Sequence, residues 1–598
     1  MAALTALALL AAACSGSGGV PGSGSGTTTT APGSTTAATT TTEPPPALCT
    51  RNEFRPGPAD EEVRSVAAED PAAAARGFVA ETFECAAEVV VVSPASLDRV
   101  ALAALLAAAR QAPLLFGDAA ASAALEAELA RLLPQRVWLV GADVAAPAVP
   151  EGTQVERLSG GPSALAAAVN EAAGGGPAFT LPVDGGPETV AVAVQAMLDG
   201  ASLEPAPPAT TTTTTTANTA TSTTAASGST TTTTTTPPGE EPAAEVAPVP
   251  AVIAGTGERG VAWLVDAGSP ALALAAAAAA LPSGGLMALV DGTDLRRLPQ
   301  VGRALQAVPG GVPAVRLVGD ITADASWQLP LLQEGQELPG GGYLLFPGRR
   351  LVALYGHAWA PELGVLAEQS PEAAVARVEP IAAEYAGEGL VVVPAFEIIA
   401  TVADARAGDD GNYSNETPVA DIRPWIETAG EAGLYVLLDL QPGRSDFLSQ
   451  ARLYEEFLRL PYVGLALDPE WRLGPDQFHL QQYGSIPAEE VNAVAEWLAG
   501  LVREEHLPQK MLLLHQFRLS MIPDRENIAV PGELALVIQM DGQGPLADKY
   551  ATWAAVTAGT EGSGWYWGWK NFYDEDSPTA TPAQVLDLEP AVVYVSYQ

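Results

Sequence analysis

Eight short apolar runs recur through the C-terminal part of the chain, and this pattern most constrains what the chain can fold into. The segments between them carry apolar residues near helical spacing. The runs read LVALYGH (351–357), LVVVPAFEII (390–399), LYVLLDLQPG (434–443), VGLALDPEW (463–471), KMLLLHQF (510–517), LALVIQMDG (534–542), GWYWGWKNF (564–572) and AVVYVSYQ (591–598). Strands that alternate with helices form parallel sheets, and eight such units in about 250 residues match a (β/α)₈ barrel. We therefore predict a TIM barrel over residues 346–598.

Polar side chains gather where the predicted strands end. In a (β/α)₈ barrel the functional residues lie at the C-terminal ends of the strands. Side chains two positions apart in a strand lie on the same face. By this rule, Glu397, Asp439 and His515 share a face with residues that point into the barrel. The candidate site residues are His357, Glu397, Asp439, Asp468, Glu470, His515, Gln539, Asp541, Trp567 and Lys570.

The run VGLALDPEW ends in two carboxylates one residue apart, Asp468 and Glu470. In a strand, side chains at i and i+2 share a face, so both carboxylates follow Gly464 and Ala466 on one face. Two carboxyl groups held close together in a partly dry pocket raise the pKa of one of them by repulsion and desolvation. We expect the pair to lie in the barrel mouth with one carboxyl protonated near neutral pH.

Two strand ends resemble those of a known enzyme family. DPEW on the fourth strand and QMDG on the sixth resemble the D-x-E and [MQ]-x-[YF]-D strand ends of chitinase-type glycoside hydrolase barrels. The resemblance implies that Glu470 is the general acid, that Asp468 tunes its pKa and that Asp541 positions the substrate. The remaining strand-end residues would then bind the glycan. Over nearly its whole length, the barrel also resembles uncharacterised barrel domains of actinobacterial lipoproteins.

Two other functions fit the same residues. A barrel that binds glycan without cleaving it has no need for Glu470 to ionise. A metal-dependent hydrolase would use His357, His515, Asp439 and Asp468 as mixed ligands. The sequence has no H-x-H pair on the first strand and no H-E-x-x-H motif, and no G-x-G-x-x-G or Walker pattern lies between a strand and a helix. We therefore predict neither a metal ion nor another cofactor.

An internal repeat precedes the barrel. Residues 88–118 lead to RVWLVGADV (136–144), and residues 260–292 lead to AVRLVGDIT (314–322). Each copy reads strand, alanine-rich helix, strand, helix and a strand that closes in LVG, which favours a parallel α/β unit. Both copies resemble the cell wall-binding repeat 2 family of Gram-positive surface proteins, which implies binding to a wall polymer. An α/β module without a wall ligand is the alternative.

Low-complexity tracts set the expected domain boundaries. Residues 15–46 and 205–245 are rich in Thr, Ser and Pro and have few apolar side chains to bury, so we predict that they are disordered. They leave a first α/β repeat (47–204), a second α/β repeat (246–345) and the barrel (346–598).

The chain has three cysteines, and their surroundings indicate an extracytoplasmic protein. Residues 1–14 resemble the end of a bacterial lipoprotein signal peptide, which implies lipidation at Cys14. A plain secretory signal and an ordinary apolar N-terminus are the alternatives. In an oxidising compartment Cys49 and Cys85 form an even pair, and we expect a disulfide between them. We predict a lipid-anchored protein of the cell membrane or a protein of the cell wall.

The charge balance argues against two kinds of direct partner. Asp and Glu number 70 against 29 Lys and Arg, which gives a net charge of −41. Such a chain is repelled by nucleic acid and by anionic lipid headgroups. The expected partners are cell-wall polysaccharide or peptidoglycan, with the membrane reached through the lipid anchor alone.

Lipidation at Cys14 can be tested directly. Metabolic labelling of the producing cells with a palmitate analogue should mark the wild-type protein and should not mark Cys14→Ser, because the thiol is the acceptor. Equal labelling of the two proteins, or labelling of neither, would contradict the lipoprotein assignment.

Overall fold

The computed structural model describes residues 46–58, 60–118, 122–175, 178–182, 185–204, 249–387 and 389–598. Cys14, the tract 15–45 and the tract 205–248 lie outside the described residues, so the predictions of lipidation and disorder that fall on them stay predictions. We describe the α/β part (residues 47–345) and the barrel part (residues 346–598) in turn.

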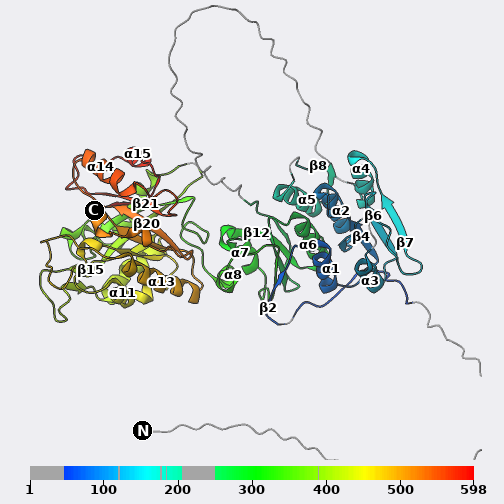
Figure 1. The fold of residues 1–598 in the computed structure, drawn as a ribbon, viewed down its shortest axis with the longest axis horizontal. Coiled ribbons are helices and arrows are strands. Elements are labelled where there is room, and N and C mark those ends of the chain that lie inside the picture. The colour runs from blue at the N-terminus through cyan, green and yellow to red at the C-terminus, as the bar shows by residue number, and fades with distance from the viewer. Residues whose placement is uncertain are drawn as a thin grey trace, which may run out of the picture. The chain divides into compact units, whose positions relative to one another are not determined.

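The barrel part contains a closed barrel of eight parallel strands, as the apolar runs predicted (Figure 1). The first strand pairs with both the second and the last, and this double pairing closes the sheet. The strands are β14 (Arg349–Gly356), β15 (Val391–Ala403), β17 (Tyr435–Leu440), β18 (Val463–Leu467), β19 (Lys510–His515), β20 (Leu534–Met540), β21 (Tyr566–Asn571) and β22 (Val592–Tyr597). A short strand, β16 (Ser414–Glu416), pairs antiparallel with the end of β15.

Helices connect most of the strands. They are α9 (Pro371–Ala383), α10 (Val419–Glu431), α11 (Phe447–Ala451), α12 (Glu455–Leu458), α13 (Ala488–Glu504), α14 (Leu546–Thr557) and α15 (Pro582–Leu586). The connection from β19 to β20 carries two 3₁₀ turns, η6 (Leu519–Met521) and η7 (Arg525–Asn527). Further 3₁₀ turns are η2 (Pro361–Leu363), η3 (Leu366–Glu368), η4 (Arg452–Tyr454) and η5 (Pro469–Trp471).

Helix α13 illustrates why these segments are helical. Its buried residues include Val491, Val494 and Leu498, which recur three and four positions apart and form one apolar face. Glu489 lies in the first turn and Arg503 in the last, and both charges are favourable next to the helix dipole.

Side chains fill the barrel interior in layers of different chemistry. Apolar residues fill the layers away from the C-terminal mouth: Leu351, Ala353, Val393, Ala395, Tyr435, Leu437, Ala466, Met511, Leu513, Ala535, Val537 and Tyr594. Two residues further along several strands, the inward side chains become polar, and Glu397, Asp439 and His515 are fully buried there. The charged layer therefore rests on an apolar one.

The α/β part contains two larger sheets and several helices. The first sheet has the order β5-β4-β6-β7, and the second has the order β10-β12-β11-β13-β2. The strands are β1 (Glu53–Phe54), β2 (Glu62–Val66), β3 (Phe83–Cys85), β4 (Glu88–Val92), β5 (Leu114–Phe116), β6 (Arg136–Val140), β7 (Gln154–Leu158), β8 (Ala178–Thr180), β9 (Ser202–Glu204), β10 (Ile253–Gly255), β11 (Val261–Asp266), β12 (Leu286–Val290) and β13 (Ala314–Val318). The helices are α1 (Pro71–Thr82), α2 (Leu97–Arg110), α3 (Ala123–Leu132), α4 (Pro162–Ala173), α5 (Pro187–Asp199), α6 (Pro270–Ser283), η1 (Leu295–Arg297), α7 (Pro299–Gln306) and α8 (Ala325–Glu334).

The two sheets do not follow the expected boundary between the repeats. Strand β2, which lies early in the chain, pairs in parallel with β13 and completes the second sheet. Arg316 of β13 is 3% exposed, and its guanidinium donates to carboxylate oxygens of Glu62 and Glu81. Pairing with β2 covers an edge of β13 that would otherwise be open. The first and second α/β segments are therefore interleaved.

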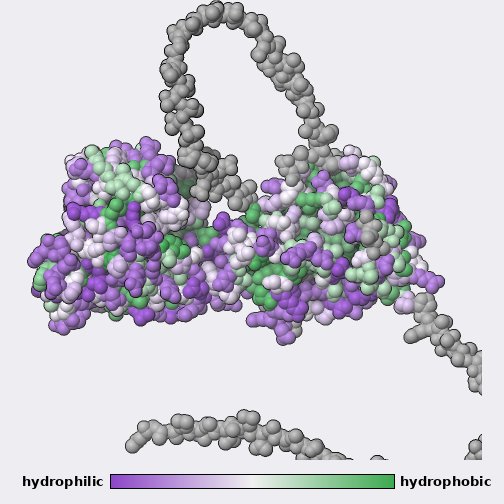
Figure 2. All heavy atoms as spheres, in the orientation of Figure 1, coloured by the Kyte–Doolittle hydropathy of each residue, from purple (hydrophilic) through white to green (hydrophobic). Residues whose placement is uncertain are grey.

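The alanine-rich helix α6 is buried on all sides. Nine of its residues, from Leu272 to Ala280, are buried, and they pack in the same core as α2 and α5. A helix that is apolar all round belongs in a core or a membrane. Among the described residues, no helix is long and apolar enough to cross a membrane. On the visible face of each part, hydrophilic and apolar residues are mixed, and the apolar ones cover more of the α/β part (Figure 2).

A disulfide joins Cys49 to Cys85, as predicted, and closes a loop with a sequence separation of 36. Removing it with Cys49→Ala and Cys85→Ala should lower the free energy of unfolding of the α/β part by about 4 kcal/mol, because the unfolded chain regains the entropy of the open loop. Equilibrium denaturation of the wild-type and variant proteins measures this. An unchanged free energy of unfolding would contradict this account.

Candidate active site

Five acidic and two basic side chains meet at the C-terminal mouth of the barrel. Six strands, or the turns that follow them, each contribute one or two of these side chains. Toward the C-terminal end of each of these strands, the positions that point into the barrel are occupied by polar residues. The acids are Glu397, Asp439, Asp468, Glu470 and Asp541, and the bases are His515 and Lys570. All are buried except Glu470, which is partly exposed.

His515 holds the centre of this cluster. Its Nδ1 lies 2.6 Å from Asp541 Oδ2, and its Nε2 lies 2.9 Å from Glu397 Oε1. Carboxylates accept hydrogen bonds, so both ring nitrogens face acceptors and the arrangement favours the imidazolium. Burial alone would lower the pKa of His515, but the charges of Glu397 and Asp439 outweigh it and hold this pKa well above its usual value.

Further bonds tie the cluster to the remaining strands. The Tyr594 hydroxyl donates to Glu397 Oε2 at 2.9 Å, and the Tyr355 hydroxyl donates to Asp439 Oδ2 at 2.9 Å. The Lys570 ammonium lies 3.4 Å from the centroid of the Tyr355 ring and 3.6 Å from Asp541 Oδ2.

The excess of acids over bases shifts several pKa values. Burial raises the pKa of Asp439 to about 6, against the charge of His515. Burial and then the charge of Glu470 raise the pKa of Asp468 well above its usual value. Burial and then the charge of Asp541 raise the pKa of Glu470 to about 7. Isolated charges are costly in a dry site, so these carboxyls hold protons that a solvated carboxyl would lose.

Asp541 behaves in the opposite way. Burial would raise its pKa, but the charge of Lys570 and the hydrogen bond and charge of His515 outweigh burial and lower the pKa of Asp541 below its usual value. The site therefore pairs a carboxyl that keeps its proton near neutral pH, Glu470, with one that stays ionised.

The DPEW segment is not a continuation of strand β18, contrary to the prediction. Strand β18 ends at Leu467, and Pro469–Trp471 form the 3₁₀ turn η5. Asp468 caps this turn, because its Oδ1 accepts from the Glu470 amide at 3.3 Å. The turn, and not strand alternation, brings Glu470 into the mouth beside Asp468.

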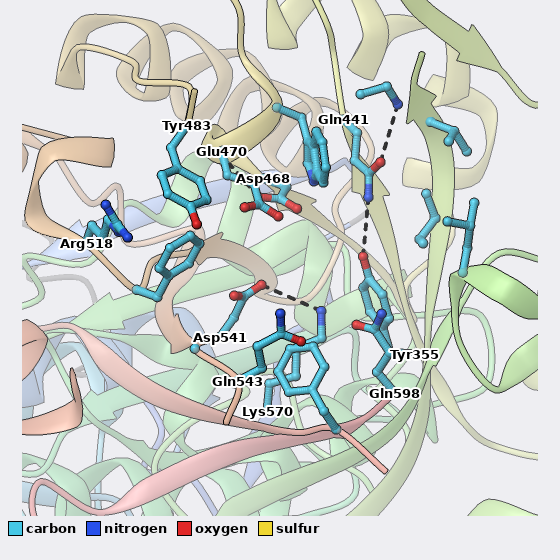
Figure 3. A pocket seen from close by; sticks show the side chains of 18 of the residues that line it. Tyr355, Gln441, Asp468, Glu470, Tyr483, Arg518, Asp541, Gln543, Lys570 and Gln598 are labelled. Carbon is cyan, nitrogen blue, oxygen red and sulfur yellow. Dashed lines mark hydrogen bonds and ion pairs between the residues drawn. The ribbon is translucent and has the colours of Figure 1, made fainter. Parts of the chain in front are cut away.

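A cavity of about 530 Å³ opens above the cluster (Figure 3). Of the predicted residues, Asp468, Glu470, Asp541 and Lys570 line it. In Figure 3 the Glu470 and Asp468 carboxyls face the same space as Asp541. Aromatic side chains form much of its wall: Tyr355, Trp471, Tyr483, Phe517 and Phe572.

Six predicted residues do not line the cavity. Glu397, Asp439 and His515 lie below it and hold the lining residues in place through the hydrogen bonds and ion pairs above. Gln539 is also buried, and its Nε2 donates to Ser596 Oγ at 2.6 Å.

His357 and Trp567 lie elsewhere, contrary to the prediction. Strand β14 ends at Gly356, where φ is 152°, and this turns His357 out of the inward phase so that its Nε2 lies 3.1 Å from Thr417 Oγ1. Trp567 is three positions before the inward-facing Lys570, so it lies on the outer face of β21. Its ring packs edge-on against Trp553 of α14 at 5.9 Å.

The sequence reasoning missed several cavity residues. Tyr355 had a signal, because it lies in phase with Leu351 and Ala353 on the first strand. Trp471, Tyr483 and other residues of the loops after β18 and β19 had none, because period-2 counting ends with the strand. The missed residues with polar or aromatic groups are Tyr355, Gln441, Trp471, His479, Tyr483, Phe517, Arg518, Gln543, Phe572 and Gln598.

One subset of the cluster has the composition of a metal site. Ligand atoms of Asp468, His515 and Asp541 all lie within 4.8 Å of one another. Both nitrogens of His515 already face carboxylates, and the Lys570 ammonium faces Asp541, so a cation bound through His515 would have to replace a proton there.

Comparisons with known proteins leave the family of this chain open. No family model and no curated protein matches the sequence. Among solved structures, Cwp8 from Clostridium difficile is 13% identical, with a TM-score of 0.32, over 46% of this chain and 52% of that chain. Cwp6 from Clostridium difficile is 12% identical, with a TM-score of 0.30, over 66% of this chain and 65% of that chain. Each match spans less than two thirds of the other chain, and at these TM-scores the likeness carries no inference about fold or activity.

Proposed function

We propose that the barrel is a glycoside hydrolase of the cell envelope in which Glu470 is the proton donor. One observation supports this most: a carboxyl with a pKa of about 7 and a carboxylate with a lowered pKa line the same cavity. Glycoside hydrolysis needs these two states, one to protonate the leaving oxygen and one to stabilise the positive charge that develops on the sugar.

Each residue of the cluster has a role in this proposal. Glu470 gives its proton to the oxygen of the glycosidic bond as that bond breaks. Asp541 stays ionised because the charges of Lys570 and His515 favour its carboxylate form, and it stabilises the oxocarbenium-like transition state. Water then bonds to the anomeric carbon, and a proton from this water restores the acid form of Glu470. Asp468 caps the turn that carries Glu470 and so fixes the position of the donor.

The cavity wall suits a sugar. Sugar rings present C–H faces that pack on aromatic side chains, and the wall offers several such rings together with the amides of Gln441, Gln543 and Gln598. Small-molecule sites of this kind combine an apolar wall with a few polar groups that set orientation.

The cellular setting is part of the proposal. The Cys49–Cys85 disulfide is typical of extracytoplasmic proteins. With a lipid anchor at Cys14 and α/β repeats that bind a wall polymer, the barrel would act on cell-wall polysaccharide or peptidoglycan. Without turnover, the same cavity would make the barrel a glycan-binding surface protein.

A metal-dependent hydrolase is the second candidate, because Asp468, His515 and Asp541 are close enough to share a cation. The proton-donor account predicts that EDTA leaves the hydrolysis rate unchanged. A rate lost in EDTA and restored by one divalent ion would favour the metal candidate.

Glu470→Gln should lower kcat by about 10²- to 10⁴-fold and leave substrate binding intact, because the amide keeps the shape and has no proton to give. Hydrolysis of wall glycan fragments and binding to the same fragments measure the two effects. Glu362→Gln is the matched control, since Glu362 is exposed in η2 and does not line the cavity. Unchanged activity in Glu470→Gln would remove Glu470 as the donor.

The rate should depend on pH in a direction set by the two carboxyls. kcat/KM should fall as pH rises through about 7, where Glu470 loses its proton, and should persist into acid because the pKa of Asp541 is lowered. The charge of Lys570 lowers both pKa values, so Lys570→Met should move both limbs of the pH profile to higher pH. A descending limb that stays in place in this variant would contradict the assignment.

A further inference from the structure

One arginine on the cavity wall has no acidic partner. Among the residues that the structure describes, Arg518 is the only arginine that lines the cavity, and it follows β19 by three residues. Its guanidinium forms no ion pair and no hydrogen bond with any of the described residues, although the chain carries 70 acidic residues. Its N–H donors are therefore free for a ligand.

Two aromatic rings hold this guanidinium at the wall. Its Cζ lies 4.3 Å from the centroid of the Tyr483 ring and 5.7 Å from that of Phe517, and the two rings pack edge to face at 5.1 Å. Stacking on aromatic faces restricts the side chain and leaves the edge of the guanidinium open. Figure 3 shows Arg518 beside Tyr483, on the opposite side of the cavity from Tyr355.

The charges of the cavity differ from one side to the other. On the floor, Lys570 is 3.6 Å from Asp541 and is thus neutralised, and Asp468 and Glu470 lie nearby. This floor therefore offers an anionic group no unpaired cation, and the acidic chain as a whole, which has a net charge of −41, repels such a group. Arg518 is the place in the cavity where such a group gains a favourable partner.

We propose that the cavity selects a glycan that carries a carboxylate, and that Arg518 binds this carboxylate and so sets which glycosidic bond faces Glu470. A planar guanidinium matches a carboxylate with two parallel hydrogen bonds. The inference rests on the proposed glycan-directed function of the same cavity and adds the substrate class. The carboxylate belongs either to a uronic acid ring or to a lactyl ether on an amino sugar.

Binding measurements on the full chain test this proposal. Glu470→Gln serves as the background so that the probes are not consumed. The probes are an oligogalacturonate, its fully methyl-esterified form, and a disaccharide that contains N-acetylmuramic acid alongside its lactyl methyl ester. Each ester keeps the ring and removes the charge. Isothermal titration gives the four dissociation constants. The oligogalacturonate and its ester test for a uronic acid, and the disaccharide and its ester test for a lactyl ether.

At least one acid should bind about 10-fold or more tightly than its own ester, as expected for a hydrogen bond to a charged group. Arg518→Gln should abolish this preference and leave the affinity for the ester unchanged, whereas Arg518→Lys should keep part of it. Arg406→Gln is the matched control, because the side chain of Arg406 is 91% exposed and does not line the cavity. The preference should also shrink with added salt.

Three results would overturn the proposal: equal affinity for acid and ester, an equal loss of affinity for acid and ester in Arg518→Gln, or no binding of any probe. These outcomes are separable from failure of the hydrolase. Wild-type protein that prefers the acid but cleaves nothing refutes hydrolysis and keeps the carboxylate site. Wild-type protein that cleaves neutral glycans without such a preference refutes the carboxylate site alone.

Discussion

The mouth of the barrel depends on one buried imidazole held between two carboxylates. His515 contacts Asp541 of the segment after β20 and Glu397 of β15, and it lies 3.6 Å from Asp439 of β17. Five carboxyls share this space with two basic groups, so the cluster cannot be neutral if every carboxyl ionises. The excess is met by protons, which remain on the carboxyls whose pKa is raised. Glu470, at the solvent side of the cluster, is one of these.

This arrangement explains why the charged layer lies where it does. The inward side chains of the lower barrel are apolar and closely packed, which provides a rigid floor and excludes water. In such surroundings each charge must find a partner or take up a proton. The hydroxyls of Tyr594 and Tyr355 satisfy carboxylate oxygens of Glu397 and Asp439. The groups left facing the cavity are those that a substrate can reach.

The sequence allowed a good prediction of the barrel and a partial prediction of the site. Apolar runs marked all eight strands, and period-2 counting placed Glu397, Asp439 and His515 inside correctly, because strand alternation is a local rule. Counting in steps of two from the inward-facing Lys570 would have placed Trp567 on the outer face of β21. Glu470 came to the mouth through a 3₁₀ turn that strand counting does not describe.

What could not be predicted depends on contacts between distant parts of the chain. The loop residues Tyr483 and Arg518 have no periodic signal, and only tertiary packing brings their side chains together. Strand β2 pairs with β13 across roughly 250 residues of sequence, and neither strand carries a local sign of this pairing. The interleaving of the two α/β segments could therefore not be predicted from the sequence.

The central claim is that Glu470 keeps its proton near neutral pH. A ¹³C NMR titration of the side-chain carboxyls measures this directly, with the Glu470 signal assigned by its disappearance in Glu470→Gln. The account predicts a midpoint near 7 for this carboxyl. A midpoint near the ordinary glutamate value of about 4.3 would contradict it, because Glu470 would then be ionised at neutral pH and could not serve as the proton donor.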